Sequence, residues 1–221
     1  MTLFSRIKRR LISSETPVLS SVDAYALWAN SYPAEAHNVL MQLEQESMLS
    51  LMPDVPEKVV LDLACGTGRY GKIAENMEAG QVIGIDNSEA MLQKAVIPAV
   101  SLATTGAIPL ATASVDVILC GMALGHLPDI KSSISEISRV LKPGGIALIS
   151  DFHPYQFLSG AKRTFQFNET TYAVEHHVHH ISEYVAIASE NSLSLTGLKE
   201  PVYQNNIPVV LVMHFTKNAT L

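Results

Sequence analysis

The stretch LDLACGTGRYG, residues 61–71, decides the fold. It begins inside a short apolar run, residues 59–63, whose β-branched side chains predict a strand buried on both faces. Gly66, Gly68 and Gly71 then spell G-x-G-x-x-G where a helix is expected to begin. Glycines at this spacing let the backbone turn tightly and lie against a ligand. The stretch therefore predicts a nucleoside-binding turn between a strand and a helix of an α/β sheet.

Asp86 lies twenty residues after Gly66, at the end of the next apolar run, residues 82–85. A carboxylate at this position can accept hydrogen bonds from both hydroxyls of a ribose. Two ligands fit: a dinucleotide such as NAD, with its pyrophosphate on the helix N-terminus, or S-adenosylmethionine, which has no phosphate. Asp62, four residues before Gly66, favours the second, because negative charge suits a sulfonium or amino group. The glycine pattern alone leaves both ligands open.

The following sequence alternates apolar runs with helical patterns. Residues 115–119 and 146–149 are two further runs, and the apolar positions of residues 128–141 recur on one face of a helix. Pro143-Gly144-Gly145 is expected to end that helix before the next strand. We therefore predict a parallel α/β sheet with right-handed crossovers.

The flanking regions complete this plan. Residues 23–52 are predicted to be helical, and Pro53 and Pro56 mark a boundary after them. The C-terminal third is expected to contain a hairpin (163–167 with 171–174), a short helix (182–188) and two strands (192–195 and 209–213). The expected organisation is an N-terminal helical cap at 1–55, a cofactor-binding core at 56–155, and a hairpin insertion with the last strands at 156–221.

Four segments, in order, resemble the motifs of the class I S-adenosylmethionine-dependent methyltransferases: residues 60–68, 84–92, 108–118 and 139–145. The resemblance covers roughly residues 58–151, and residues 25–32 are similar to the start of the cap helix in small members. It implies a Rossmann-like α/β fold: a mostly parallel seven-stranded sheet with helices on both faces and an antiparallel C-terminal strand. It also implies an enzyme that transfers a methyl group from S-adenosylmethionine to a small-molecule acceptor by in-line displacement, leaving S-adenosylhomocysteine.

The resemblance also implies which residues hold the cofactor. Asp62 would face its amino end, Asp86 the ribose, and Gly121 the methionyl group through its backbone, while Tyr25 or Tyr32 would reach the carboxylate. The full expected set is Tyr25, Tyr32, Asp62, Ala64, Gly66, Thr67, Gly68, Asp86, Asn87, Met91, Thr104 and Gly121. Thr104 departs from the family, whose members carry an acid near this position, so adenine binding is expected to be weaker.

Methyl transfer depends mostly on alignment, and a general base helps only some acceptors. His126 and His153 follow the fourth and fifth strands, where ligands bind in open α/β sheets. In the cluster at residues 176–180, His179 is the candidate base or ligand suggested by similar small methyltransferases. Each histidine has a structural alternative, as a cap, a packing residue or part of a polar loop. A structural metal is not expected, because no carboxylate or cysteine partners stand at suitable spacing.

The amino-acid composition limits the kinds of binding partner that we expect. Of 221 residues 48% are hydrophobic and 16% charged, as in a globular protein, and the net charge of -6 argues against a nucleic-acid surface. The sequence predicts a cytoplasmic monomer or homodimer. The basic segment Arg6–Arg10 is either a frayed terminus or an arm that touches a membrane. Two rival functions remain: an NAD-dependent oxidoreductase, and a protein that binds the cofactor without transferring its methyl group.

Overall fold

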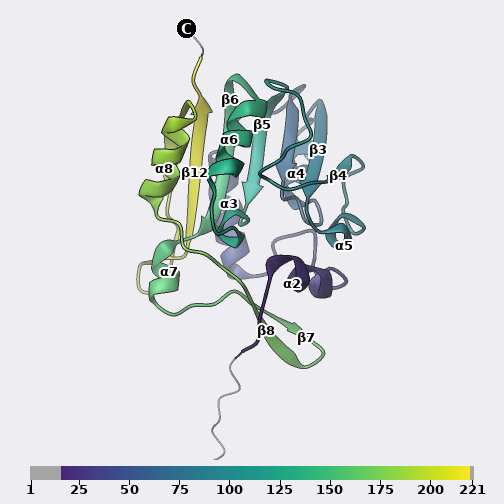
Figure 1. The fold of residues 1–221 in the computed structure, drawn as a ribbon, viewed down its shortest axis with the longest axis vertical. Helices are drawn as coiled ribbons and strands as arrows, with labels where there is room; N and C mark the ends of the chain where they lie inside the picture. Colours follow the sequence, from purple (N-terminus) through teal and green to yellow (C-terminus); the bar gives the residue numbers. More distant parts are fainter. Residues whose placement is uncertain (1–15, 220–221) are drawn as a thin grey trace, which may run out of the picture.

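A seven-stranded sheet organises the molecule in the computed structural model, which describes residues 16–219 (Figure 1). Its strand order is β4-β3-β2-β5-β6-β12-β9. The strands are β2 (Val59–Leu63), β3 (Gln81–Asp86), β4 (Val100–Leu102), β5 (Val115–Gly121), β6 (Leu141–Phe152), β9 (Leu193–Lys199) and β12 (Val210–Lys217). The first five run parallel, and β12 is antiparallel to both β6 and β9. The predicted fold class is confirmed.

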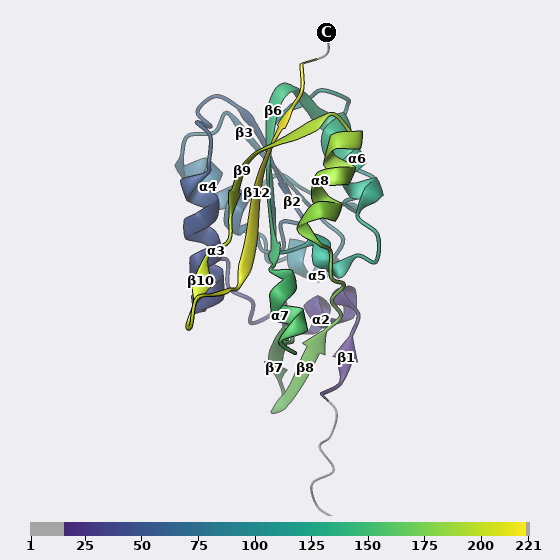
Figure 2. The same cartoon turned by 90° about the vertical axis from the view of Figure 1, so that its left-hand side faces the viewer.

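Helices cover both faces of this sheet (Figure 2). Helices α3 (Val39–Ser50) and α4 (Arg69–Asn76) pack on one face, and α6 (Lys131–Val140) and α8 (Ile181–Glu190) pack on the other. Successive side chains of a strand point to opposite faces, and residues 117–120 of β5 alternate accordingly between the two hydrophobic cores. Central strands buried on both sides explain why the sequence shows continuous apolar runs.

The predicted helix over residues 23–52 is wrong in its middle. The structure has α2 (Ser21–Trp28) and α3, separated by residues 29–38 without helix. Pro33 disfavours the helical conformation for the residue before it and removes a backbone donor. Asn38 then starts α3, because its side-chain oxygen accepts from the N–H of Met41 at 3.0 Å.

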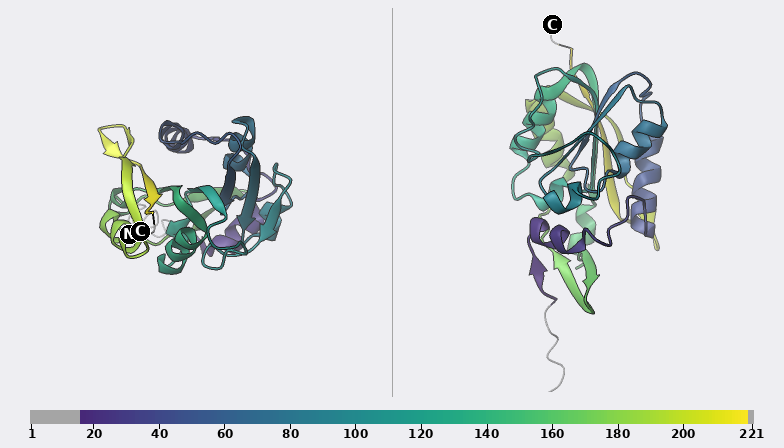
Figure 3. Two further views of the ribbon diagram at one scale, coloured as in Figure 1. Left: turned by 90° about the horizontal axis from the view of Figure 1, so that it is seen from above. Right: turned by 90° about the vertical axis from the view of Figure 1, so that its right-hand side faces the viewer.

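A second, three-stranded sheet stands beyond the carboxyl ends of the parallel strands (Figure 3). It pairs β1 (Val18–Leu19) with β8 (Thr170–Val174), which forms the predicted hairpin with β7 (Thr164–Phe167). With α2 this sheet encloses a small core of its own around Ala24, Phe165 and Val174. We call α2 together with β1, β7 and β8 the roof.

Short elements complete the chain: α5 (Glu89–Leu92), the 3-10 turn η1 (Leu124–His126), α7 (Pro154–Leu158), β10 (Val202–Tyr203) and β11 (Ile207–Pro208). Pro143-Gly144-Gly145 does not separate helix from strand as expected. It lies inside β6, and the pairing of β5 with β6 shifts register between Val115 and Val117. The predicted hairpin, the helix near 182–188 and the two final strands are present as β7–β8, α8, β9 and β12.

The described residues contain no helix with the length and apolar character needed to cross a bilayer. The basic segment Arg6–Arg10 lies outside the described residues, so contact of this arm with a membrane stays a prediction. The boundaries expected at residues 55/56 and 155/156 also stay a prediction.

Candidate active site

A cavity of about 370 Å³ lies between the carboxyl ends of the parallel strands and the roof. This is where open α/β sheets bind their ligands, and the volume is in the range of small-molecule sites. All of the expected cofactor residues except Gly68 line it: Tyr25, Tyr32, Asp62, Ala64, Gly66, Thr67, Asp86, Asn87, Met91, Thr104 and Gly121. Gly68 instead forms the N-cap of α4, with a left-handed φ of 89° that a side chain would strain.

Asp86 fastens the glycine turn to the tip of β3. One carboxylate oxygen accepts from the N–H of Gly66 at 2.7 Å, and the other accepts from the N–H of Ser88 at 2.8 Å. Burial raises the pKa of this carboxyl, and the two N–H groups oppose that shift. A carboxylate has about four lone-pair positions, so Asp86 retains acceptor capacity toward the cavity that it lines.

Asp62 places a second carboxyl under the same turn. It is 2% exposed, and its Oδ2 accepts from the N–H of Gly71 in the first turn of α4 at 2.7 Å. Burial raises its pKa to about 7, although the Gly71 N–H and the charge of Arg69 act in the opposite direction. The group therefore changes its ionisation near neutral pH.

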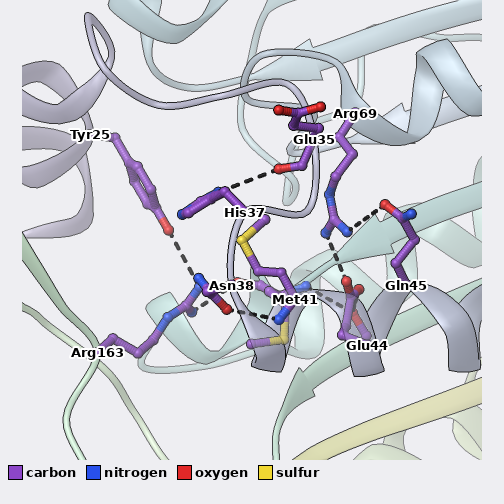
Figure 4. Close-up of polar contacts among 11 residues, drawn as sticks. Tyr25, Glu35, His37, Asn38, Met41, Glu44, Gln45, Arg69 and Arg163 are labelled. Carbon is purple, nitrogen blue, oxygen red and sulfur yellow. Dashed lines mark hydrogen bonds and ion pairs between the residues drawn. The ribbon is translucent and has the colours of Figure 1, made fainter.

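Glu44 and Arg69 form a buried ion pair beside this end of the cavity (Figure 4). The Arg69 Nη2 donates to Glu44 Oε2 at 2.8 Å, and its Nη1 donates to Gln45 Oε1 at 3.3 Å. Ser150 Oγ donates to the other Glu44 oxygen at 2.5 Å. Because Glu44 neutralises Arg69, Asp62 and Asp86 leave this end of the cavity with net negative charge.

The turn after β5 forms the floor. A Cβ on Gly121 would lie 2.5 Å from the ring of Tyr70, so only glycine fits there. Met122 follows with a φ of 58°, which is uncommon for a residue with a side chain. Its N–H donates to Ser150 Oγ at 3.0 Å, and its carbonyl accepts from Arg163 Nη1 at 2.9 Å. These bonds hold the strained turn against the cavity.

Tyr25, His126 and Arg163 meet on the cavity wall. His126 Nδ1 lies 2.9 Å from the carbonyl of Glu175, which can only accept, so Nδ1 carries the proton. The bare Nε2 then accepts from the Tyr25 hydroxyl at 3.1 Å. Burial, and after it the charge of Arg163, lowers the pKa of His126 well below its usual value. The imidazole is neutral at pH 7 and offers a basic nitrogen beside the cavity.

The sequence around this cavity matches a known domain family. Residues 61–149 match the family model described as "Methyltransferase domain". The chain carries a class I S-adenosylmethionine-dependent methyltransferase domain. S-adenosylmethionine is the cofactor of that family.

Known proteins resemble the chain in sequence and in fold. A demethylmenaquinone methyltransferase of Lactococcus lactis is 33% identical over 134 residues, 53% of each protein. A malonyl-[acyl-carrier protein] O-methyltransferase of Xylella fastidiosa is 31% identical over 142 residues, 59% of this chain and 48% of that protein. The chain thus spans about half the length of these curated relatives. A methyltransferase structure from Mesorhizobium loti superposes with a TM-score of 0.67 at 18% identity, over 79% of this chain and 97% of that one.

Two of the three histidines expected at the site lie elsewhere. We expected His153 at the pocket, but its Nδ1 caps α7 through the N–H of Tyr155, and its Nε2 pairs with Glu200 at 2.8 Å. His179 is buried, with Nε2 2.8 Å from the carbonyl of Leu127 and Nδ1 3.2 Å from Glu183. Both side chains anchor loops around the methyltransferase domain and do not line the cavity.

Three residues at or beside the cavity were not predicted from the sequence. Glu44 had a readable signal, because it stands on the buried face of α3 between Met41 and Met48. A carboxylate on an apolar helix face indicates a buried partner. Arg69 directly follows the glycine turn, but no feature of the nearby sequence indicates that Glu44 is its partner. The left-handed turn at Met122 has no sequence signal that we recognise.

Proposed function

We propose that this protein transfers the methyl group of S-adenosylmethionine to a small-molecule acceptor. The observation that carries the proposal is the convergence of the glycine turn, Asp62 and Asp86 on one cavity with an acidic end. That end suits a ligand with a ribose and positively charged amino and sulfonium groups.

The same observation disfavours NAD. A pyrophosphate binds at a helix N-terminus through free N–H groups. Here the N–H of Gly71, in the first turn of α4, already donates to Asp62, and the Asp62 carboxylate would repel phosphate oxygens. Arg69 offers little compensation because Glu44 holds its charge.

The residues present fit S-adenosylmethionine in the following way. Asp86 would accept from the ribose hydroxyls, Asp62 would face the amino group, and the backbone at Gly121 would lie along the methionyl chain. When bound, the cofactor supplies an electrophilic methyl group. The chain itself orients the acceptor and shields the reaction from water, which accounts for much of the rate enhancement in a displacement of this type.

His126 is the proposed base for a hydroxyl acceptor. As the acceptor oxygen takes the methyl group, it releases its proton to the Tyr25 oxygen, and Tyr25 passes its own proton to His126 Nε2. Arg163 Nη2 lies 3.4 Å from the Tyr25 oxygen and stabilises negative charge there. The imidazolium then loses its proton to solvent, which the low pKa of His126 favours.

The proposed acceptor is a small molecule with an apolar body. One curated relative is named for demethylmenaquinone and the other for malonyl-[acyl-carrier protein], so their names do not agree on an acceptor. Trp28, Leu40, Phe152 and Val174 line the cavity and favour an apolar body. We further propose that the protein works in the cytoplasm as a monomer or homodimer.

Formation of S-adenosylhomocysteine tests the proposed function. The full chain is incubated with S-adenosylmethionine and a panel of phenols, quinols and hydroxy acids, and the product is quantified by liquid chromatography. We expect at least one compound to stimulate its formation and to gain 14 mass units. Tight cofactor binding with no stimulation by any acceptor would favour a protein that binds the cofactor without transferring its methyl group.

A further inference from the structure

Arg163 is a cation in the cavity wall whose described contacts are all with neutral groups. It donates to the Met122 carbonyl and to the Tyr25 hydroxyl, and its guanidinium carbon lies 5.1 Å from the centre of the Phe152 ring. Within residues 16–219 no carboxylate lies within ion-pair distance of it, in contrast to Arg69. A guanidinium has five N–H donors, and these two hydrogen bonds leave three for a ligand.

Charge is distributed unevenly along the cavity. Asp62 and Asp86 stand at the ends of β2 and β3, where the nucleoside is proposed to bind. Arg163 lies over the turn that follows β5 and against Phe152 at the end of β6, on the other side of β2 in the strand order. Lys162 lines the same region of the wall. One end thus suits a cation and the other an anion.

We infer that the acceptor carries a carboxylate, which Arg163 holds while a hydroxyl of the same molecule faces Tyr25 and His126. This inference rests on the proposed function and names its substrate class, an apolar or aromatic hydroxy acid. Arginine binds carboxylates through paired, charge-assisted hydrogen bonds. Phe152, stacked against the guanidinium, also offers a surface for the apolar part of the acceptor.

The cofactor is the second possible source of a carboxylate. The family resemblance puts its carboxylate near Tyr25 or Tyr32, and Arg163 contacts Tyr25. We favour the acceptor because the guanidinium lies against Phe152 at the end of β6. This is one strand beyond β5, whose last residue, Gly121, is the expected cofactor residue farthest from Asp86 in the strand order. Binding experiments separate the two sources.

The test uses 2-naphthoate and its neutral isostere 2-naphthamide as probes. Each is titrated calorimetrically into the full chain saturated with S-adenosylhomocysteine. We expect the acid to bind at least about tenfold more tightly than the amide, as charge-assisted hydrogen bonds predict. Arg163→Gln should abolish this preference, and Arg163→Lys should keep part of it. Lys131→Gln, which removes an exposed cation on α6, should leave it unchanged.

Each outcome has a defined meaning. Affinity for S-adenosylhomocysteine within about threefold of wild type shows that Arg163→Gln is folded and that the cofactor does not depend on Arg163. A loss of more than about tenfold would assign Arg163 to the cofactor carboxylate and overturn the inference. Equal binding of acid and amide, or no binding of the acid, would also overturn it. Failure of the wild-type chain to bind S-adenosylhomocysteine would instead refute the proposed function.

Discussion

Asp62 gives the site a pH dependence that can be measured. Its pKa of about 7 means that it is mostly protonated in the free protein at pH 5.5. Because the amino group of S-adenosylmethionine favours the ionised carboxylate, affinity should rise roughly tenfold from pH 5.5 to pH 7.5. Calorimetric titration at several pH values checks this expectation, and Asp62→Asn should bind more weakly with a nearly flat profile.

The same ionisation affects stability with the opposite sign. The folded-state pKa of Asp62 lies above its value of 3.8 in an unfolded chain, so its contribution is fully present below about pH 4 and is lost as the pH rises through about 7. Asp62→Asn should remove this loss in urea unfolding measured across that range. A wild-type pH slope in the variant would contradict the assignment.

His126 should matter for turnover more than for binding. With an acceptor that reacts at a hydroxyl, His126→Gln is expected to lower kcat about 100-fold, since general base catalysis contributes factors of this order. The KM for S-adenosylmethionine should change little. His180→Gln is the matched control, because His180 is exposed and does not line the cavity. An unchanged kcat for His126→Gln would remove the base from the mechanism.

At the residue scale, the sequence predicts residues that belong to a known local motif. Gly66 and Asp86 are twenty positions apart, and a hydrogen bond joins them in the structure. Partners far apart in the sequence could not be predicted. His153 was expected at the cavity, but it pairs with Glu200, 47 positions away, and does not line the cavity. The role of Arg163 likewise depends on Tyr25, which is 138 positions distant.

The buried pair between α3 and α4 should contribute strongly to stability. Glu44→Gln leaves the Arg69 guanidinium buried without a counter-charge, and breaking such a pair typically costs about 3–5 kcal/mol. Urea unfolding followed by circular dichroism measures the loss. Combining Glu44→Gln with Arg69→Met should recover much of it, while the exposed neighbour Glu46→Gln should be nearly neutral. Equal free energies of unfolding for Glu44→Gln and Glu46→Gln would contradict a buried ion pair.

At the element scale, the central strands β2, β3, β5 and β6 were predicted, because burial on both faces produces a continuous apolar run. The residues at which helices begin and end were harder to predict. The helical region stops at Trp28 and restarts after Asn38, with Pro33 between them, although the apolar spacing alone suggested one helix. The Pro143-Gly144-Gly145 segment lies within β6, because β6 pairs with β5 on both sides of it.

The roof should become more rigid when the cofactor binds. It is held by the stacked rings of Trp28 and Phe165, whose centroids are 4.9 Å apart, and by few other buried side chains. Amide hydrogen exchange in α2 and in β7–β8 should slow on adding S-adenosylhomocysteine, while β9 should not respond. Phe165→Ala should speed exchange in the roof alone and weaken cofactor binding about tenfold. Uniform acceleration across the central sheet would contradict an independent roof core.

For the whole molecule, the matched domain could be predicted from the sequence more fully than the roof, where we propose that the acceptor binds. Residues 61–149 carry ordered local motifs, so their fold could be predicted. The roof combines residues 18–28 with residues 164–174, and only three-dimensional contacts bring them together. We propose that the acceptor binds at this junction, which would explain why the sequence predicted a methyltransferase but not its substrate.

The central claim is that the acidic cavity binds S-adenosylmethionine, and isothermal titration with S-adenosylmethionine, S-adenosylhomocysteine and NAD tests it most directly. The account predicts micromolar binding of the first two and no detectable binding of NAD. Asp86→Ala should abolish binding, whereas Asp54→Asn, which removes an exposed carboxylate, should preserve it. Binding of NAD alone, or cofactor binding unaffected by Asp86→Ala, would contradict the account.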